Sequence, residues 1–282
     1  QYHDTSSRYS SLMQQRLTRG HGIIALIVCA APLSFGFIIP VSLLINWAID
    51  TCSDVLGKDF YLLFFNSLLL AFITSMLAVG IALFMAYSNR NNQLLLNKIM
   101  VRLVSMGYAI PGTVIAVGVL IPFAWFDNSL DNFLIQNFNI SSGLLVSGTV
   151  FILVFAYLVR FLAVSINTVE AALVKIKPVM DEVAKTTGMR ANNIIRSIHM
   201  PMMRGSLLTA SLLVFVDVLK ELPATLILRP FNFNTLAVRT YELANEELLA
   251  EAAVPALAIV IVGIIPVIII SNSISRSRPG HG

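Results

Sequence analysis

Charge is scarce in this chain. Only 12% of its 282 residues are Asp, Glu, Lys or Arg, whereas 57% are hydrophobic and the mean hydropathy is +0.81. A soluble domain carries about 25% charged residues, so an apolar surplus of this size cannot be buried in one globular core. The composition excludes an ordinary soluble protein and indicates that membrane lipid surrounds much of the chain. The net charge of +4 does not indicate nucleic-acid binding, because the cations are segregated by loop.

Cysteine, histidine and phosphate-binding motifs are equally sparse. The two cysteines, Cys29 and Cys52, are far from any C-x-x-C spacing, which excludes a disulfide framework and a thiolate metal site. The four histidines form no H-x3-H pair, so we predict no metal site, and nothing in the sequence indicates a catalytic nucleophile with its base. We expect His199 to pack or to cap a helix. The chain also lacks the G-x4-G-K-[ST] loop that holds nucleotide phosphates, so any ATP must be bound by another polypeptide.

Six stretches are long and apolar enough to cross a bilayer as helices, which takes about 20 residues. They lie at about 22–49, 60–88, 99–124, 143–167, 206–228 and 252–271. We therefore predict an all-α integral membrane domain over 22–271, preceded by a polar segment at 1–21 and followed by a tail at 272–282. Because the chain begins with Gln1 and not Met, we expect a fragment or a processed chain.

Lysine and arginine are distributed unevenly between the loops that join these spans. Fifteen lie on one side, seven of them in the stretch 160–205 that begins with Arg160, and three lie on the other. Loops rich in Lys and Arg stay on the cytoplasmic side of a membrane. The count predicts that both termini and the loop 168–205 are cytoplasmic, and that the opposite, more acidic face is external.

The loop 168–205 carries an amphipathic pattern. Its apolar residues at 169, 172, 173, 176, 179, 180, 183 and 184 recur at helical spacing. Pro178 predicts the first turn of a helix, Gly188 its end, and Asn192 the N-cap of a second short helix. Pro201 is expected to break that helix before the fifth span. A helix lying on the lipid surface would explain the pattern, but a groove on a protein partner fits better because aromatic anchors are absent from the loop.

Within this loop, five residues carry a family resemblance. Glu182, Ala184, Gly188, Ile198 and Pro201 resemble the E-A-A-x3-G-x9-I-x-L-P signature of bacterial ABC-importer permeases, with Val183 in place of the first alanine and Met200 in place of leucine. The resemblance implies the type I permease fold, with the loop acting as a coupling helix that docks on a cytoplasmic ABC ATPase dimer. In that family the ATPase binds ATP and Mg, Glu182 would contact it, and Gly188 would set the turn that aims the helix.

The fifth predicted span carries Asp217, Lys220 and Glu221. Ionisable groups inside a membrane mark a transport path by default, so these three are candidates for the translocation path. Asp217 and Lys220 are three residues apart and can pair on one helix face. Glu221 would be satisfied by another helix, by water or by the substrate. A structural ion-pair network, or a helix that breaks near Pro223, explains the same residues without a role in transport.

The run K-E-L-P-A-T-L-I-L-R-P-F-N-F-N-T-L-A-V-R at 220–239 resembles the second half of ferric-iron ABC permeases. The resemblance implies import of Fe(III) across the bacterial inner membrane, delivered by a periplasmic substrate-binding protein, with a second six-span half fused or separate. Arg229, Arg239 and Glu242 in the external loop are candidates for docking that binding protein, or they simply solvate the loop.

Three other functions stay open. The same kind of permease could carry molybdate, sulfate, thiamine or a polyamine. A secondary transporter without an ATPase is a second class, although the chain shows no convincing internal repeat. A membrane-embedded enzyme is the third.

Overall fold

The computed structural model describes residues 17–91 and 94–277. Most of the predicted polar segment 1–21 and the end of the tail 272–282 lie outside these ranges. The described helices are α1 (Arg19–Leu33), α2 (Ile39–Val55), α3 (Lys58–Asn91), α4 (Leu95–Ser105), α5 (Gly112–Phe138), α6 (Val150–Val174), α7 (Pro178–Thr186), α8 (Ala191–Ile194), α9 (Met200–Leu219), α10 (Pro223–Leu228), α11 (Leu236–Asn245) and α12 (Leu249–Ser277). Short π-helical turns at Ser34–Ile38 and Ile195–His199 join α1 to α2 and α8 to α9.

Six segments of this chain are long and apolar enough to cross a membrane. They are Arg19–Val55, Lys58–Asn91, Gly112–Phe138, Val150–Val174, Ala191–Leu219 and Leu249–Asn272. No strand occurs among the described residues. The predicted all-helical class with six membrane helices is confirmed.

The predicted third span, 99–124, is wrong in position. The chain forms the short helix α4, a 3₁₀ turn at Gly107–Ala109 and an extended bend at Pro111 before the long helix α5 begins. Hydropathy alone could not detect this division, because both sides of the bend are apolar. The fourth span is shifted as well, from 143–167 to Val150–Val174.

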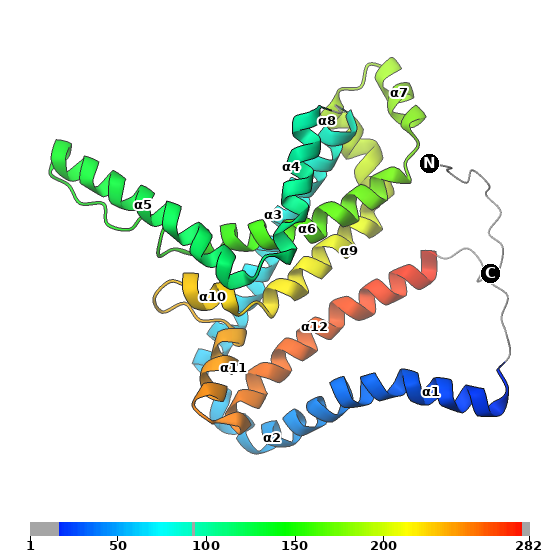
Figure 1. Ribbon diagram of the computed structural model, residues 1–282, viewed down its shortest axis with the longest axis vertical. Helices are drawn as coiled ribbons and strands as arrows, with labels where there is room; N and C mark the ends of the chain where they lie inside the picture. The colour runs from blue at the N-terminus through cyan, green and yellow to red at the C-terminus, as the bar shows by residue number, and fades with distance from the viewer. Residues whose placement is uncertain (1–16, 92–93, 278–282) are drawn as a thin grey trace.

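Two aspartates explain that shift. Asp127 in α5 is only 1% exposed, and its carboxylate accepts the backbone N–H of Ser147 at 2.7 Å. One turn further on, Asp131 accepts the backbone N–H groups of Ser142 and Gly143 at 2.7 and 3.1 Å. These bonds occupy three of the backbone donors of the segment 139–149, which runs back along α5 without forming a helix (Figure 1).

The centre of the bundle is formed by α3, α6 and α9, which pack on one another. Along α3 six of the nine buried positions form a stripe of small residues: Ser67, Ala71, Ser75, Ala78, Ala82 and Ala86. Their spacing of three or four residues places them on one helix face, and small side chains allow membrane helices to approach closely. Larger apolar residues of α6, among them Leu153 and Ile166, lie in the same buried core cluster as the alanines of this stripe.

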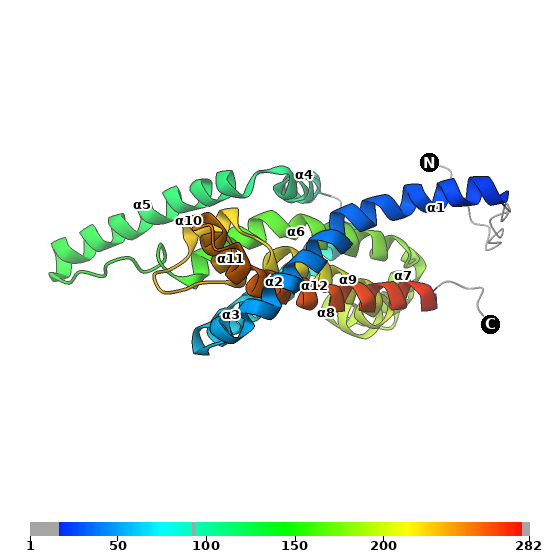
Figure 2. The same ribbon diagram turned by 90° about the horizontal axis from the view of Figure 1, so that it is seen from below.

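The outer helices extend away from this core. α5 contacts α10 and α6, and its far end projects to one side (Figures 1 and 2). α2 packs on α12, but neither α1 nor α2 has a buried residue. Three of the six apolar segments therefore form the centre, and the other three extend from it and leave long apolar faces uncovered.

Candidate functional site

α7 and α8 lie at one end of the bundle, and α10 and α11 lie at the other (Figure 1). The segment Pro178–Pro201, which contains α7 and α8, is called the coupling segment below, after the role that its resemblance to the permease signature implies. α7 begins at Pro178, whose missing N–H costs nothing in a first turn. It ends at Thr186, and Gly188 follows with a φ of 80°, a left-handed conformation that glycine adopts without strain. The predicted helix start and turn are both present.

Two details of the coupling segment differ from prediction. Asn192 is not an N-cap, because Arg190 occupies that position and α8 begins at Ala191. Pro201 does not break the helix, which runs from Ala191 through a π-helical turn to Leu219. Proline cannot donate to the carbonyl four residues earlier, but Pro201 is the second residue of α9 and follows the π-helical turn that ends at His199.

The signature residues divide into buried and exposed ones. Glu182 is exposed on α7, while Ala184 is 4% exposed. A hollow of about 380 Å³ lies between α7 and the following turn, and its lining is almost entirely apolar: Val179, Met180, Val183, Ala184, Thr187, Met189 and Ile198. An uncovered hollow of this kind at the end of a bundle is suited to receive apolar side chains of a partner.

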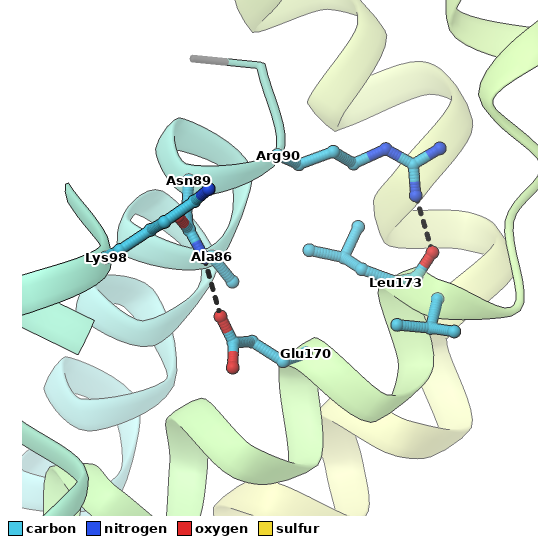
Figure 3. Close-up of a pocket in the computed structure, with 7 residues that line it drawn as sticks. Ala86, Asn89, Arg90, Lys98, Glu170 and Leu173 are labelled. Atoms are coloured by element: carbon cyan, nitrogen blue, oxygen red, sulfur yellow. Dashed lines mark hydrogen bonds between the residues drawn. The ribbon is translucent and has the colours of Figure 1, made fainter. Parts of the chain in front are cut away.

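A cluster that the sequence did not reveal attaches this segment to the bundle. Arg90, at the end of α3, donates from Nε to Asp181 of α7 at 2.8 Å. Its Nη1 donates to the carbonyl of Leu173 at 2.5 Å, as Figure 3 shows, and its Nη2 to that of Ile176 at 2.8 Å. The second oxygen of Asp181 lies 2.6 Å from Nε2 of His199, which is fully buried. His199 therefore packs, as predicted. Arg90, by contrast, enters the charge count only as one of the fifteen cations on the cytoplasmic side.

Figure 3 also shows a second hollow, beside Arg90. It has a volume of about 360 Å³ and lies between α3, α4 and α6. Asn89 donates to Glu170 across it at 3.2 Å, and Lys98 of α4 lies along its edge (Figure 3). Its walls carry both charged and apolar groups, in contrast to the hollow beside α7.

The three predicted path residues lie where the fifth span ends. α9 stops at Leu219, so the predicted span 206–228 is wrong at its C-terminal end. Lys220 pairs with Asp217 at 2.9 Å, as their spacing predicted. Glu221 is 6% exposed and accepts a hydrogen bond at 2.9 Å from Nη1 of Arg160. Glu221 is thus satisfied by another helix, one of the open alternatives.

Arg160 belongs to the membrane helix α6 and not to a loop, so its place in the charge count was wrong. Without Arg160, the count is fourteen cations on the predicted cytoplasmic side and three on the external side. Sequence reasoning missed it because hydropathy set the end of the fourth span too early. An arginine with apolar neighbours on both sides, as in Y-L-V-R-F-L-A, is the signal that could have identified it.

The Arg160–Glu221 pair joins several elements. Glu221 also accepts the backbone N–H of Ala224 at 3.3 Å, at the start of α10. Gly112, the first residue of α5, lies against the pair, since a β-carbon there would be 2.0 Å from Arg160 Nη1 and 2.6 Å from Glu221 Oε1. Beneath it, Tyr157 and Thr225 share a hydrogen bond of 2.5 Å. The break between α9 and α10 is therefore held by buried polar contacts.

The three predicted docking residues lie together at the opposite end of the bundle from α7. Arg229 donates to Glu242 at 3.0 Å and also to the side chain of Asn234. Arg239 lies 3.8 Å from the other oxygen of Glu242 and is 42% exposed. The loop that carries them is largely helical, because α11 begins at Leu236 with Thr235 as its N-cap. Within the described residues, no group of three or more His, Cys, Asp or Glu side chains is arranged to hold a metal ion.

Known proteins resemble this chain in sequence and in fold. Residues 78–278 match the family described as "Binding-protein-dependent transport system inner membrane component". Over 252 residues the chain is 27% identical to the Fe(3+)-transport system permease protein FbpB 2 of Haemophilus influenzae, covering 85% of this chain and 47% of that protein. The chain therefore spans about half the length of this curated relative.

Two solved structures share the fold. A bacterial alginate ABC transporter, in complex with its alginate pentasaccharide-bound periplasmic protein, superposes with a TM-score of 0.64 at 15% identity, over 92% of this chain and 95% of that one. The MetNI methionine ABC transporter, in inward facing conformations, gives a TM-score of 0.52 at 15% identity, over 77% of this chain and 99% of that one. The helical arrangement is that of ABC-transporter permeases, and the chain belongs to the family of binding-protein-dependent transport system inner membrane components.

Proposed function

We propose that this chain is one six-span unit of an ABC-importer permease that moves ferric iron across the bacterial inner membrane. Family membership supports the transport role. The relative named for Fe(3+) transport supports the cargo, as does the resemblance of 220–239 to ferric-iron permeases. Because the chain spans about half of that relative, we infer that a second six-span unit, fused or separate, completes the pathway.

The observation that carries the proposal is the construction of the coupling segment. Asp181 links α7 to Arg90 and His199, while the apolar hollow beside Val183 is left uncovered. A cytoplasmic ATPase dimer would dock there, and it would bind ATP and Mg²⁺. Closure of the dimer would bring the coupling segments of the two units together and switch the cavity between them from inward- to outward-facing, a rigid-body transition.

This placement sets the orientation of the chain. The coupling segment lies in the cytoplasm, and so do both termini. The end that carries α10 and α11 then faces the periplasm. Arg229, Arg239 and Glu242 lie at that end and would contact the iron-loaded binding protein.

Iron would pass close to the break between α9 and α10. Oxygen ligands suit a hard cation such as Fe(III), and the carboxylates of Asp217 and Glu221 lie at this break. Both are already paired with cations, so they offer transient contacts and not a binding site. Selection of the cargo is assigned to the binding protein.

Reconstitution tests the proposal. The complete permease, containing this chain and its second unit, is placed in liposomes with its ATPase and each candidate binding protein in turn. We expect the ferric-loaded binding protein to stimulate ATP hydrolysis and the uptake of radioactive iron. Stimulation only by a molybdate-, sulfate-, thiamine- or polyamine-loaded protein would show that this ligand, and not ferric iron, is the cargo. Failure to recover any ATPase subunit with the permease from native membranes would favour a secondary transporter.

A further inference from the structure

α7 has little apolar attachment to the rest of the chain. Of its nine residues, Pro178–Thr186, only Ala184 is buried. Apolar burial stabilises by about 25 cal/mol per Å², so one alanine contributes little to holding the helix in place. Polar contacts must supply most of what fixes its position.

Those contacts converge on one guanidinium group. All three nitrogens of Arg90 are used: one binds Asp181 of α7, and the other two bind the carbonyl oxygens of Leu173, in the last turn of α6, and of Ile176, two residues after α6 ends. The side chains of Arg90 and Asp181 are 18% and 15% exposed. A planar guanidinium presents donors in a fixed fork, which a lysine ammonium cannot reproduce. Arg90 thus fixes α7 relative to α3 and α6 at the same time.

His199 completes the attachment from the other side. Its Nε2 lies 2.6 Å from the oxygen of Asp181 that Arg90 does not use, and its ring packs edge-on against Tyr87 of α3 at 5.4 Å between centroids. His199 lies in the π-helical turn that leads into α9. Asp181 therefore links α7 to α9 as well, through the side chain of His199, which has no exposed surface.

We propose that Arg90, Asp181 and His199 are positioning residues for energy coupling. They make α7 one rigid body with the ends of α3, α6 and α9, so that a displacement imposed on α7 moves the three core helices instead of bending the segments 175–177 and 187–190. This rests on the proposed function, in which an ATPase displaces α7. A rigid element transmits such movement, whereas a loosely held one absorbs it.

The mobility of α7 provides a test that needs neither cargo nor ATPase. A nitroxide is attached to Thr186→Cys, an exposed position at the end of α7, in the complete permease with Cys29 and Cys52 replaced by serine. We expect Arg90→Lys and Asp181→Asn each to increase the mobility of the label. Arg102→Ala, at an exposed arginine of α4, serves as the matched control and should leave it unchanged. Unchanged mobility in both cluster variants would overturn the proposal.

The second test measures the number of ions transported per ATP hydrolysed by the assembled complex. We expect Arg90→Lys to retain ATP hydrolysis but to lower this ratio at least about fivefold, the lower end of typical coupling between sites. Damage to assembly alone would lower both rates together and leave the ratio intact. A wild-type ratio in the variant would overturn the inference and leave the proposed function standing. If no ferric-loaded binding protein stimulates the wild-type complex, the proposed cargo is wrong. The nitroxide experiment would still test the role of Arg90, Asp181 and His199, because it needs no cargo.

Discussion

Nη1 of Arg160 and Oε1 of Glu221 lie 2.9 Å apart, and the first residue of α5 contacts both atoms so closely that only glycine fits there. The pair joins the middle of α6 to the break after α9. A pair with so little exposure is not needed for stability as such, since apolar residues of similar volume often serve as well. Breaking it by removing one partner, however, leaves an uncompensated charge.

The first prediction therefore concerns Glu221→Ala. We expect it to reduce iron uptake more than tenfold while leaving the association with the ATPase unchanged, because the coupling segment lies at the other end of the bundle. Gly112→Ala should act in the same direction, since its β-carbon would displace the two charged side chains. Uptake and recovery of the ATPase on affinity-tagged permease are measured together. Equal loss of both would assign the pair a role in folding.

Two glycines give a matched test of packing. A β-carbon at Gly107 would lie 2.2 Å from the carbonyl oxygen of Val159, and backbone cannot move aside as a side chain can. We expect Gly107→Ala to destabilise the protein by about 1–3 kcal/mol, measured by thermal unfolding in detergent. Gly118→Ala, where the added carbon meets nothing within 4 Å, is the control and should stabilise α5 by up to about 1 kcal/mol. An equal loss of stability in both variants would contradict this packing.

The turn after α7 depends on backbone conformation alone. Gly188 has a φ of 80°, and a β-carbon there would meet no atom within 4 Å. Gly188→Pro cannot adopt that φ and also removes the N–H that donates to Lys185 at 3.0 Å. We expect this variant to reach the membrane but to lose uptake. Gly188→Asn, which tolerates the left-handed region at a cost of about 1 kcal/mol, should retain most of it; loss of uptake in both would show that the side chain, not the turn, matters.

Glu182 is the exposed acidic residue of the signature. We predict that Glu182→Lys leaves the thermal stability unchanged but weakens binding of the ATPase about tenfold or more, because it places a like or unpaired charge in the docking surface. Titration of the purified ATPase against the reconstituted permease measures this. Glu246→Lys, which reverses the charge of an exposed residue at the far end of the bundle, is the control. A wild-type affinity for Glu182→Lys would remove this residue from the interface.

Arg229 and Arg239 should behave differently, although both contact Glu242. Arg229 also holds Asn234, so Arg229→Ala is expected to lower stability, by about 1–3 kcal/mol. Arg239 is more exposed, so Arg239→Glu should slow association of the binding protein with little effect on unfolding, and more so at low salt. The association rate is followed at two ionic strengths. A rate independent of Arg239 would leave it the role of solvating the loop.

The features that could be predicted from sequence are local ones. Hydropathy identified six membrane helices, because length and apolarity are properties of contiguous residues. Pro178 and Gly188 marked the start and end of α7, and the spacing of Asp217 and Lys220 predicted their pairing. In each case the physical cause lies within a few residues of its effect.

The features that were missed depend on partners far along the chain. α6 starts late because Asp127 captures backbone donors near Ser147, and the chain after α9 breaks where Glu221 meets Arg160. Arg90 and Asp181 are ninety-one positions apart in the sequence and come into contact only because the fold places α7 beside the end of α3. None of these pairings leaves a periodic signal that a single sequence can reveal.

The stripe of alanine and serine along α3 has a consequence for which substitutions the protein tolerates. Alanine has no rotamers to rearrange, so a bulkier residue at Ala78 or Ala82, both without exposed surface, can be accommodated only by moving α3 away from the helices that pack on it, α6 and α9. Overpacking of this kind costs about 1–3 kcal/mol. The buried alanine positions of α3 are therefore among the least replaceable in the molecule. Sequence variation should concentrate instead on the large apolar residues that face outward.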